Sequence, residues 1–114
     1  MNGRFDTTPA VPYQVVYTRH AHAEKLSHPI RLQRIVESVV ENELPTQATL
    51  ETRNRFVMRP NPKAAWEQRR DPVRLYYDVD EQRQVVTIKG VVEKVGSEIR
   101  VHGRLMDLDE YLAA

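Results

Sequence analysis

The sequence predicts a single α+β domain, with two N-terminal helices packed on one face of an antiparallel sheet of about four strands. The first indication is the length, because 114 residues suit one domain with one modest core. The second is the order of the patterns, since the helical pattern comes early and the strand patterns follow it as a group. The third is composition: 40% hydrophobic and 29% charged residues are typical of globular proteins.

The N-terminal segment shows no pattern of a packed element. Residues 1–12 place two prolines around a stretch of small residues, so we expect a flexible leader there and the domain over 13–114. Residues 13–18 are rich in β-branched and aromatic side chains, which favours a first strand.

Two helices are predicted next. Residues 20–26 suit a short helix, and Ser27 is expected to cap a second helix that has Pro29 in its first turn. We expect Pro45 to end the second helix near Leu44. Apolar residues recur within it at helical spacing and share one stripe. The stripe consists of Leu32, Ile35, Val36, Val39 and Val40.

The remaining chain predicts a meander of strands. Residues 53–58 suit a strand or an extended loop, and a further strand begins at Trp66. Residues 73–79 alternate between apolar and other side chains. We therefore expect alternate faces of this strand to meet the core and the solvent. The core face would carry Val73, Leu75, Tyr77 and Val79, and the opposite face Arg74, Tyr76 and Asp78.

The C-terminal third is expected to complete the sheet. Residues 84–94 form a returning strand with Val86, Ile88 and Val92 on one face. Residues 99–101 add a short edge strand, and residues 105–112 form a closing helix. Because both N-terminal helices cover one face of the sheet, we expect the other face to be open for function.

Charge is unevenly spread along the chain. Residues 53–74 hold seven basic side chains and two acidic ones, whereas residues 80–114 hold seven acidic and five basic ones. This asymmetry points to a polyanionic partner for the middle of the chain. Within this basic segment we expect loop residues to contact the phosphate groups of that partner, and Tyr76 to stack on a base where the partner is a nucleic acid. The phosphate contacts are expected from Arg53, Arg55, Arg59 and Lys63.

Other classes of protein and site are disfavoured. With no cysteine, the chain has no disulfide, no thiolate zinc site and no cysteine nucleophile. His20, His22 and His28 lack the spacing of a metal site, and we expect neither metal nor cofactor. No apolar run approaches the ~20 residues that span a bilayer. We therefore expect a cytoplasmic protein without membrane association.

Four short motifs follow one another between Thr52 and Asp80. They are Thr52-Arg53-Asn54-Arg55, Pro60-Asn61-Pro62, Trp66-Glu67-x-Arg69 and Val73-Arg74-Leu75-Tyr76-Tyr77-Asp78-Val79-Asp80. In this combined spacing the stretch resembles the RelE/ParE superfamily of bacterial type II toxins. Together with Glu93-Lys94, Ser97 and Gly103, the resemblance extends over residues 13–108. It implies a small sheet with two helices on one side and a concave basic face on the other.

The resemblance also implies an activity and a partner. It implies a toxin that cleaves mRNA on the ribosome and so inhibits translation. A small, acidic, partly disordered antitoxin would silence it in a hetero-oligomer. Arg74 matches the family's phosphate-binding arginine, Arg69 a second position that is basic in many relatives, and Lys94 the lysine that ends the last long strand. For proton transfer, His102 or Tyr111 would stand where many members have a C-terminal Tyr or His.

Two departures from the family pattern keep a second function open. Ribonuclease members often place an arginine after the lysine, where this chain has Val95. Several also carry lysines on the strand before Arg74, where this chain has Trp66, Glu67 and Gln68. The second function is therefore a non-catalytic toxin directed at gyrase, as in the ParE branch, or a family member that acts only by binding. A third function, that of an unrelated small RNA- or protein-binding domain, applies if the chain is not a member of this family.

Overall fold

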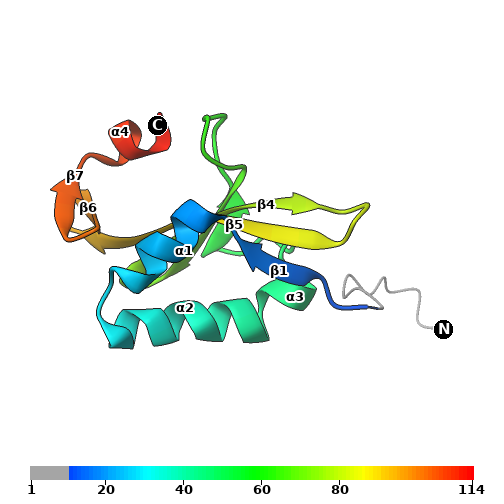
Figure 1. Cartoon of the computed structure of the whole chain (residues 1–114). Coiled ribbons are helices and arrows are strands. Elements are labelled where there is room, and N and C mark those ends of the chain that lie inside the picture. The colour runs from blue at the N-terminus through cyan, green and yellow to red at the C-terminus, as the bar shows by residue number, and fades with distance from the viewer. Residues whose placement is uncertain (1–10) are drawn as a thin grey trace.

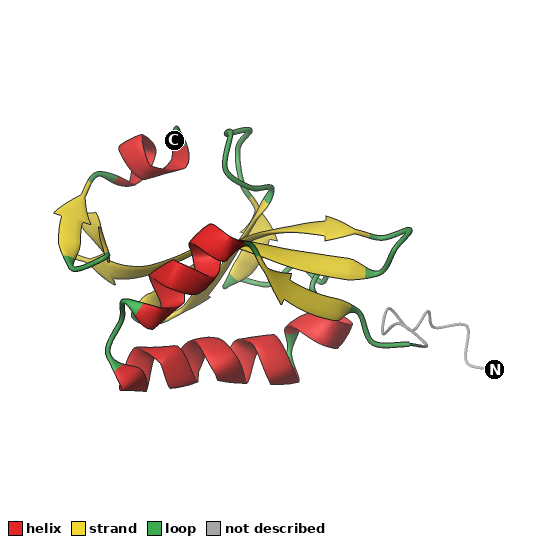
Figure 2. Ribbon diagram, in the orientation of Figure 1, coloured by secondary structure: helices red, strands yellow, loops and turns green. Residues whose placement is uncertain are grey.

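A sheet of seven strands forms the centre of the protein, and helices α1 and α2 cover one of its faces (Figures 1 and 2). The computed structural model describes residues 11–114. The predicted leader therefore lies outside the described residues, except for Val11 and Pro12, which are exposed. The elements in chain order are β1 Gln14–Tyr17, α1 Arg19–Leu26, α2 Ile30–Asn42, α3 Leu44–Gln47, β2 Arg55–Val57, β3 Trp66–Arg70, β4 Val73–Asp80, β5 Val85–Val95, β6 Glu98–Val101, β7 Arg104–Met106 and α4 Leu108–Leu112.

The strand order explains why the sheet is larger than predicted. Strands β2 to β7 lie side by side in chain order, each antiparallel to the next. Strand β1 pairs in parallel with β5. The helices and strands β2 to β4 lie between these two strands in the sequence. The prediction of about four strands was too low, because it missed β7, left β2 undecided and gave β6 only as a possible edge strand. No helix within residues 11–114 is long and apolar enough to cross a membrane.

The main core lies between the sheet and α2, as the apolar stripe predicted. Leu32, Val36 and Val39 are buried and belong to one cluster with the inward side chains of β4 and β5. Ile35 and Val40 are partly buried at its margin. The helical stripe and the core face of residues 73–79 are therefore confirmed.

The ends of the helices differ from the prediction. Ser27 is the C-cap of α1, with its hydroxyl donating to the Glu24 carbonyl oxygen at 2.6 Å, and Pro29 takes the N-cap position of α2. Helix α2 ends at Asn42, and Pro45 lies in the first turn of the next short helix, α3, which begins at Leu44. Proline suits a first helical turn because its missing N–H has no partner there in any case.

A bulge in β5 divides the apolar side chains between the two faces of the sheet. The register shifts between Tyr76 and Tyr77, so that one additional residue, Lys89, lies between their partners on β5. Such a bulge breaks the period-2 alternation. Val86 and Ile88 keep the predicted face, but Val92 turns to the opposite one, and its predicted placement was wrong.

The second face of the sheet is partly covered rather than open. A second cluster joins β4, β5, β6 and helix α4, which lies across this face from α1 and α2 (Figure 1). The closing helix predicted over residues 105–112 is shorter than expected. It begins at Leu108, and the residues before it belong to β7. The buried members of this cluster are Ala64, Tyr76, Val92, Ile99, Val101 and Tyr111.

Helix α1 fills a gap in the sheet between β1 and β6. The Glu24 carboxylate accepts the Val91 N–H at 2.8 Å, and His28 Nε2 lies 3.0 Å from the Val91 carbonyl oxygen. Two side chains thus satisfy the backbone of β5 where no strand pairs with it. The same Glu24 oxygen accepts the Tyr111 hydroxyl at 2.8 Å. The hydroxyl reaches it beside Gly90, where an added Cβ would lie 2.3 Å from the Tyr111 oxygen.

Candidate functional site

Arg69 and Arg74 are directly opposite each other on β3 and β4. Alternation places both on the second face of the sheet, away from α2. The Arg69 side chain is 47% exposed, whereas that of Arg74 is 11% exposed. With Asn54, Arg70 and Asp71 they line a hollow of about 340 Å³. The two arginines that the sequence singled out therefore share one site.

Acidic neighbours neutralise this arginine pair. Glu67 Oε2 lies 2.7 Å from Arg69 Nε and 3.8 Å from Arg74 Nε, and its side chain is only 7% exposed. Asp71 accepts from Arg74 Nη1 at 2.8 Å. The face is consequently less positive than the charge of residues 53–74 indicated. Glu67, which contacts both arginines, was not among the site residues predicted from the sequence.

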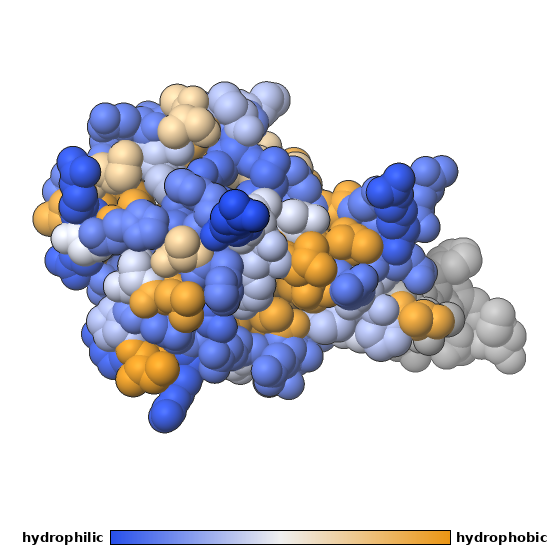
Figure 3. Space-filling model, in the orientation of Figure 1, coloured by the Kyte–Doolittle hydropathy of each residue, from blue (hydrophilic) through white to orange (hydrophobic). Residues whose placement is uncertain are grey.

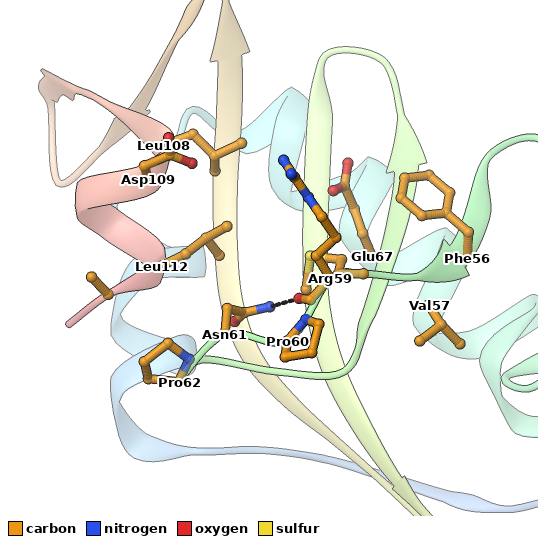
Figure 4. A pocket seen from close by; sticks show the side chains of 12 residues that line it. Phe56, Val57, Arg59, Pro60, Asn61, Pro62, Glu67, Leu108, Asp109 and Leu112 are labelled. Carbon is orange, nitrogen blue, oxygen red and sulfur yellow. Dashed lines mark hydrogen bonds between the residues drawn. The ribbon is translucent and has the colours of Figure 1, made fainter.

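Glu67 also belongs to a larger pocket beside the arginines. This pocket, of about 630 Å³, lies between the loop after β2 and helix α4. Figure 4 shows Arg59 and Glu67 projecting together on one side of it, with Leu108 and Leu112 of α4 on the other. An extended ligand that contacts Arg69 and Arg74 would thus find an adjoining groove with both apolar and charged walls.

Arg55 is a structural residue, which contradicts its prediction as an RNA contact. Its side chain is 3% exposed. It donates to Glu43 Oε1 at 2.9 Å, to Gln68 Oε1 at 2.6 Å and to the Leu50 carbonyl oxygen at 3.2 Å. Glu43 also pairs with Arg70. A carboxylate before α3 therefore neutralises two bases of residues 53–74.

Arg55→Ala is expected to lower the free energy of unfolding by about 2 kcal/mol, because it leaves Glu43 and Gln68 without their buried partner. Arg53→Ala, two residues away and exposed, serves as the control and should stay within about 0.5 kcal/mol of wild type. Urea unfolding measures both values. Equal stabilities of the two variants would contradict the structural role of Arg55.

Tyr76 is also buried, so its prediction as an exposed stacking residue was wrong. It is 0% exposed beneath α4, and its ring lies 6.0 Å from that of Tyr111. Burial is the main reason that its pKa is raised, and the nearby Glu67 raises the pKa further. The Tyr76 hydroxyl is the one buried side-chain polar atom within residues 11–114 that lacks a hydrogen-bond partner.

The remaining predicted site residues do not line the hollow with Arg69 and Arg74. Arg53 and Arg59 are exposed, and Lys63 Nζ sits over the Tyr111 ring, 4.4 Å from its centroid. Lys94, two residues beyond the Val92 that pairs with Arg74, donates to the Gly96 carbonyl oxygen at the C-terminal end of β5. His102 lies in the β6–β7 turn, with its ring centroid 6.3 Å from that of His20.

The structure therefore assembles only part of the predicted catalytic set. His102 lines another pocket, of about 670 Å³, with Glu24 and Tyr111. The Tyr111 hydroxyl donates to the buried Glu24 carboxylate, and burial together with this contact raises the pKa of Tyr111. Within residues 11–114, no three His, Cys, Asp or Glu side chains are placed to hold a metal ion.

The face seen in Figure 3 is mostly hydrophilic, interrupted by several groups of apolar atoms. The exposed large apolar residues are spread over several elements. They are Val11, Leu26, Ile30, Leu50, Val57 and Leu105.

A solved toxin–antitoxin complex contains a chain with the same fold. That chain belongs to the crystal structure of RelBE2 from Mycobacterium tuberculosis. The match has a TM-score of 0.67 and 24% sequence identity, and it covers 76% of this chain and 97% of that chain. No protein-family model and no curated protein sequence matches the chain. The likeness confirms the RelE-like fold that the resemblance of residues 52–80 implied.

Proposed function

We propose that this protein is the toxin of a type II toxin–antitoxin pair and cleaves mRNA on the ribosome. The observation that carries the proposal is the direct pairing of Arg69 with Arg74 on the face opposite α2. The RelBE2 complex, a toxin–antitoxin assembly with a chain of this fold, supports it.

The arginines suit one part of RNA cleavage. Cleavage through the 2′-hydroxyl needs a proton acceptor, positive charge on the scissile phosphate and a proton donor for the leaving 5′-oxygen. An arginine fork can bind two phosphate oxygens and stays protonated at all relevant pH values. Arg74, held by Asp71 and by the Val73 carbonyl oxygen, is the proposed phosphate ligand, and Arg69 assists it.

The hollow around Arg74 lacks the predicted proton-transfer groups, and for this reason the proposal includes the ribosome. His102 and Lys94 do not line the hollow around Arg74. An enzyme with an incomplete set of proton-transfer groups gains most from a substrate that is already positioned. We therefore propose slow cleavage of free RNA and productive cleavage only of ribosome-bound mRNA.

The proposed partner is an antitoxin with an acidic, partly disordered segment. That segment would cover the face with Arg69 and Arg74, since opposite charge favours association and blocks RNA. The proposed complex is a hetero-oligomer in the cytoplasm.

A non-catalytic toxin directed at gyrase is the second candidate. The observation that favours it is the separation of His102 from Arg74. A protein that only binds needs no proton-transfer groups near its arginines.

Induction of the protein in bacteria, with mapping of mRNA 5′ ends, distinguishes these functions. Wild type should arrest translation and create new 5′ ends within coding regions, and Arg74→Ala should do neither. Arg83→Ala, whose side chain is 84% exposed in a hairpin, is the matched control and should behave as wild type. DNA damage without new mRNA ends would instead support the gyrase-directed toxin, and unaffected growth would contradict both.

A further inference from the structure

Glu67 occupies the place on the arginines that a phosphate would take. Its Oε2 contacts Nε of both Arg69 and Arg74, at 2.7 and 3.8 Å. Carboxylates and phosphates bind the same edge of a guanidinium group. A phosphate can therefore use both arginines fully only after the Glu67 carboxylate has moved away.

The residue opposite Glu67 on the neighbouring strand offers a second hydrogen-bonding partner for this carboxylate. Glu67 and Tyr76 are directly opposite each other on β3 and β4, and facing side chains in antiparallel strands have Cβ atoms about 5 Å apart. The Tyr76 hydroxyl is buried and lacks a partner. A buried hydroxyl of this kind favours any rearrangement that brings an acceptor to it.

We propose that Glu67 is a two-position gate, bound to Arg69 and Arg74 in the free protein and hydrogen-bonded to the Tyr76 hydroxyl when the phosphates of RNA take the arginines. This inference rests on the proposed RNA function and adds its regulation. The gate weakens binding of any single phosphate, because each must displace a carboxylate first. RNA that is also held at other points, as on the ribosome, would displace the carboxylate, because those contacts raise the effective concentration of its phosphate at the arginines.

The surroundings keep the arginines in place in both positions of Glu67. Arg69 stacks over the Phe56 ring, 4.9 Å from its centroid, and Arg74 keeps its bond to Asp71. A tyrosine hydroxyl is protonated at neutral pH, and burial raises the pKa of Tyr76 further, so this hydroxyl can donate to the carboxylate.

The experiment measures binding of a short single-stranded 2′-O-methyl RNA, which cannot be cleaved, to full-length variants. Glu67→Gln should bind it at least ~10-fold more tightly, because an amide competes for guanidinium groups far less than a carboxylate. Tyr76→Phe should bind ~3-fold or more weakly, since the displaced carboxylate loses its new partner. In the Glu67→Gln background, adding Tyr76→Phe should weaken RNA binding much less than it does in wild type.

Glu93→Gln provides the matched control. It removes the same charge from a carboxylate that pairs with Arg100, outside the site, and should change affinity by less than ~2-fold. The gate would be overturned if Glu67→Gln bound no more tightly than Glu93→Gln, or if Tyr76→Phe bound as tightly as wild type. Tyr76→Phe alone decides the question should Glu67→Gln fail to fold.

Failure of the proposed function gives a different result. Adding Arg74→Ala to Glu67→Gln should weaken RNA binding by at least ~10-fold. If it left the affinity unchanged, RNA would not use this arginine site, and both the site and its gate would be overturned. If Arg74→Ala weakened binding while Glu67→Gln did not strengthen it, the site would stand and only the gate would be rejected.

Discussion

Glu24→Leu should lower the free energy of unfolding by roughly 3–5 kcal/mol, although the residue lies on a helix and touches no proposed ligand. Its side chain is 1% exposed, and one of its oxygens accepts both the Val91 N–H and the Tyr111 hydroxyl. Leucine would leave both donors buried without an acceptor, at about 1–3 kcal/mol each. The edge of β5 between β1 and β6 would also lose its contact with the α1 carboxylate.

Urea unfolding followed by circular dichroism measures this effect. Glu41→Leu is the control, because Glu41 is exposed on α2 and its replacement should stay within about 0.5 kcal/mol of wild type. Gly90→Ala tests the same junction from the other side, since its methyl group would force the Tyr111 hydroxyl away from Glu24. Full stability of both Glu24→Leu and Gly90→Ala would contradict this account of the junction.

Local periodicity predicted the elements that depend on it. The stripe from Leu32 to Val40 and the alternation from Val73 to Val79 each place one apolar face on one core, and neighbours along the chain determine this. The β5 bulge was not predictable in this way, because Lys89 and Gly90 acquire their places from the pairing with β4. The role of Glu24 was hidden for a similar reason, since its partners are 67 and 87 residues away in the sequence.

The candidate site was predicted in part. Arg69 and Arg74 were selected from the family resemblance. Their direct pairing depends on the register of the two strands, which alternation along each strand does not determine. Counting charge within residues 53–74 overestimated the basic face, because Glu43 lies outside that segment and pairs with Arg55. Glu67, two residues before Arg69 and on the same face of its strand, could have been identified from the period of 2.

Arg74→Ala should reduce ribosome-dependent cleavage by at least ~10²-fold, the scale seen when one donor to a transition-state oxyanion is removed. Its cost in stability should be about 1 kcal/mol or less, because Glu67 keeps its shorter contact with Arg69 and the Asp71 partner is exposed. Thermal melting of the purified variant checks the second value. Unfolding of Arg74→Ala would mean that the arginine is structural, as Arg55 is.

Cleavage of one mRNA, free and on programmed ribosomes, by wild type and by Arg74→Ala is the most direct measurement. We expect wild type to cut the ribosome-bound mRNA, to leave the free mRNA almost intact, and to lose the ribosomal activity when Arg74 is replaced. Rapid cutting of free mRNA by wild type, or undiminished ribosomal cutting by Arg74→Ala, would contradict the central role of Arg74.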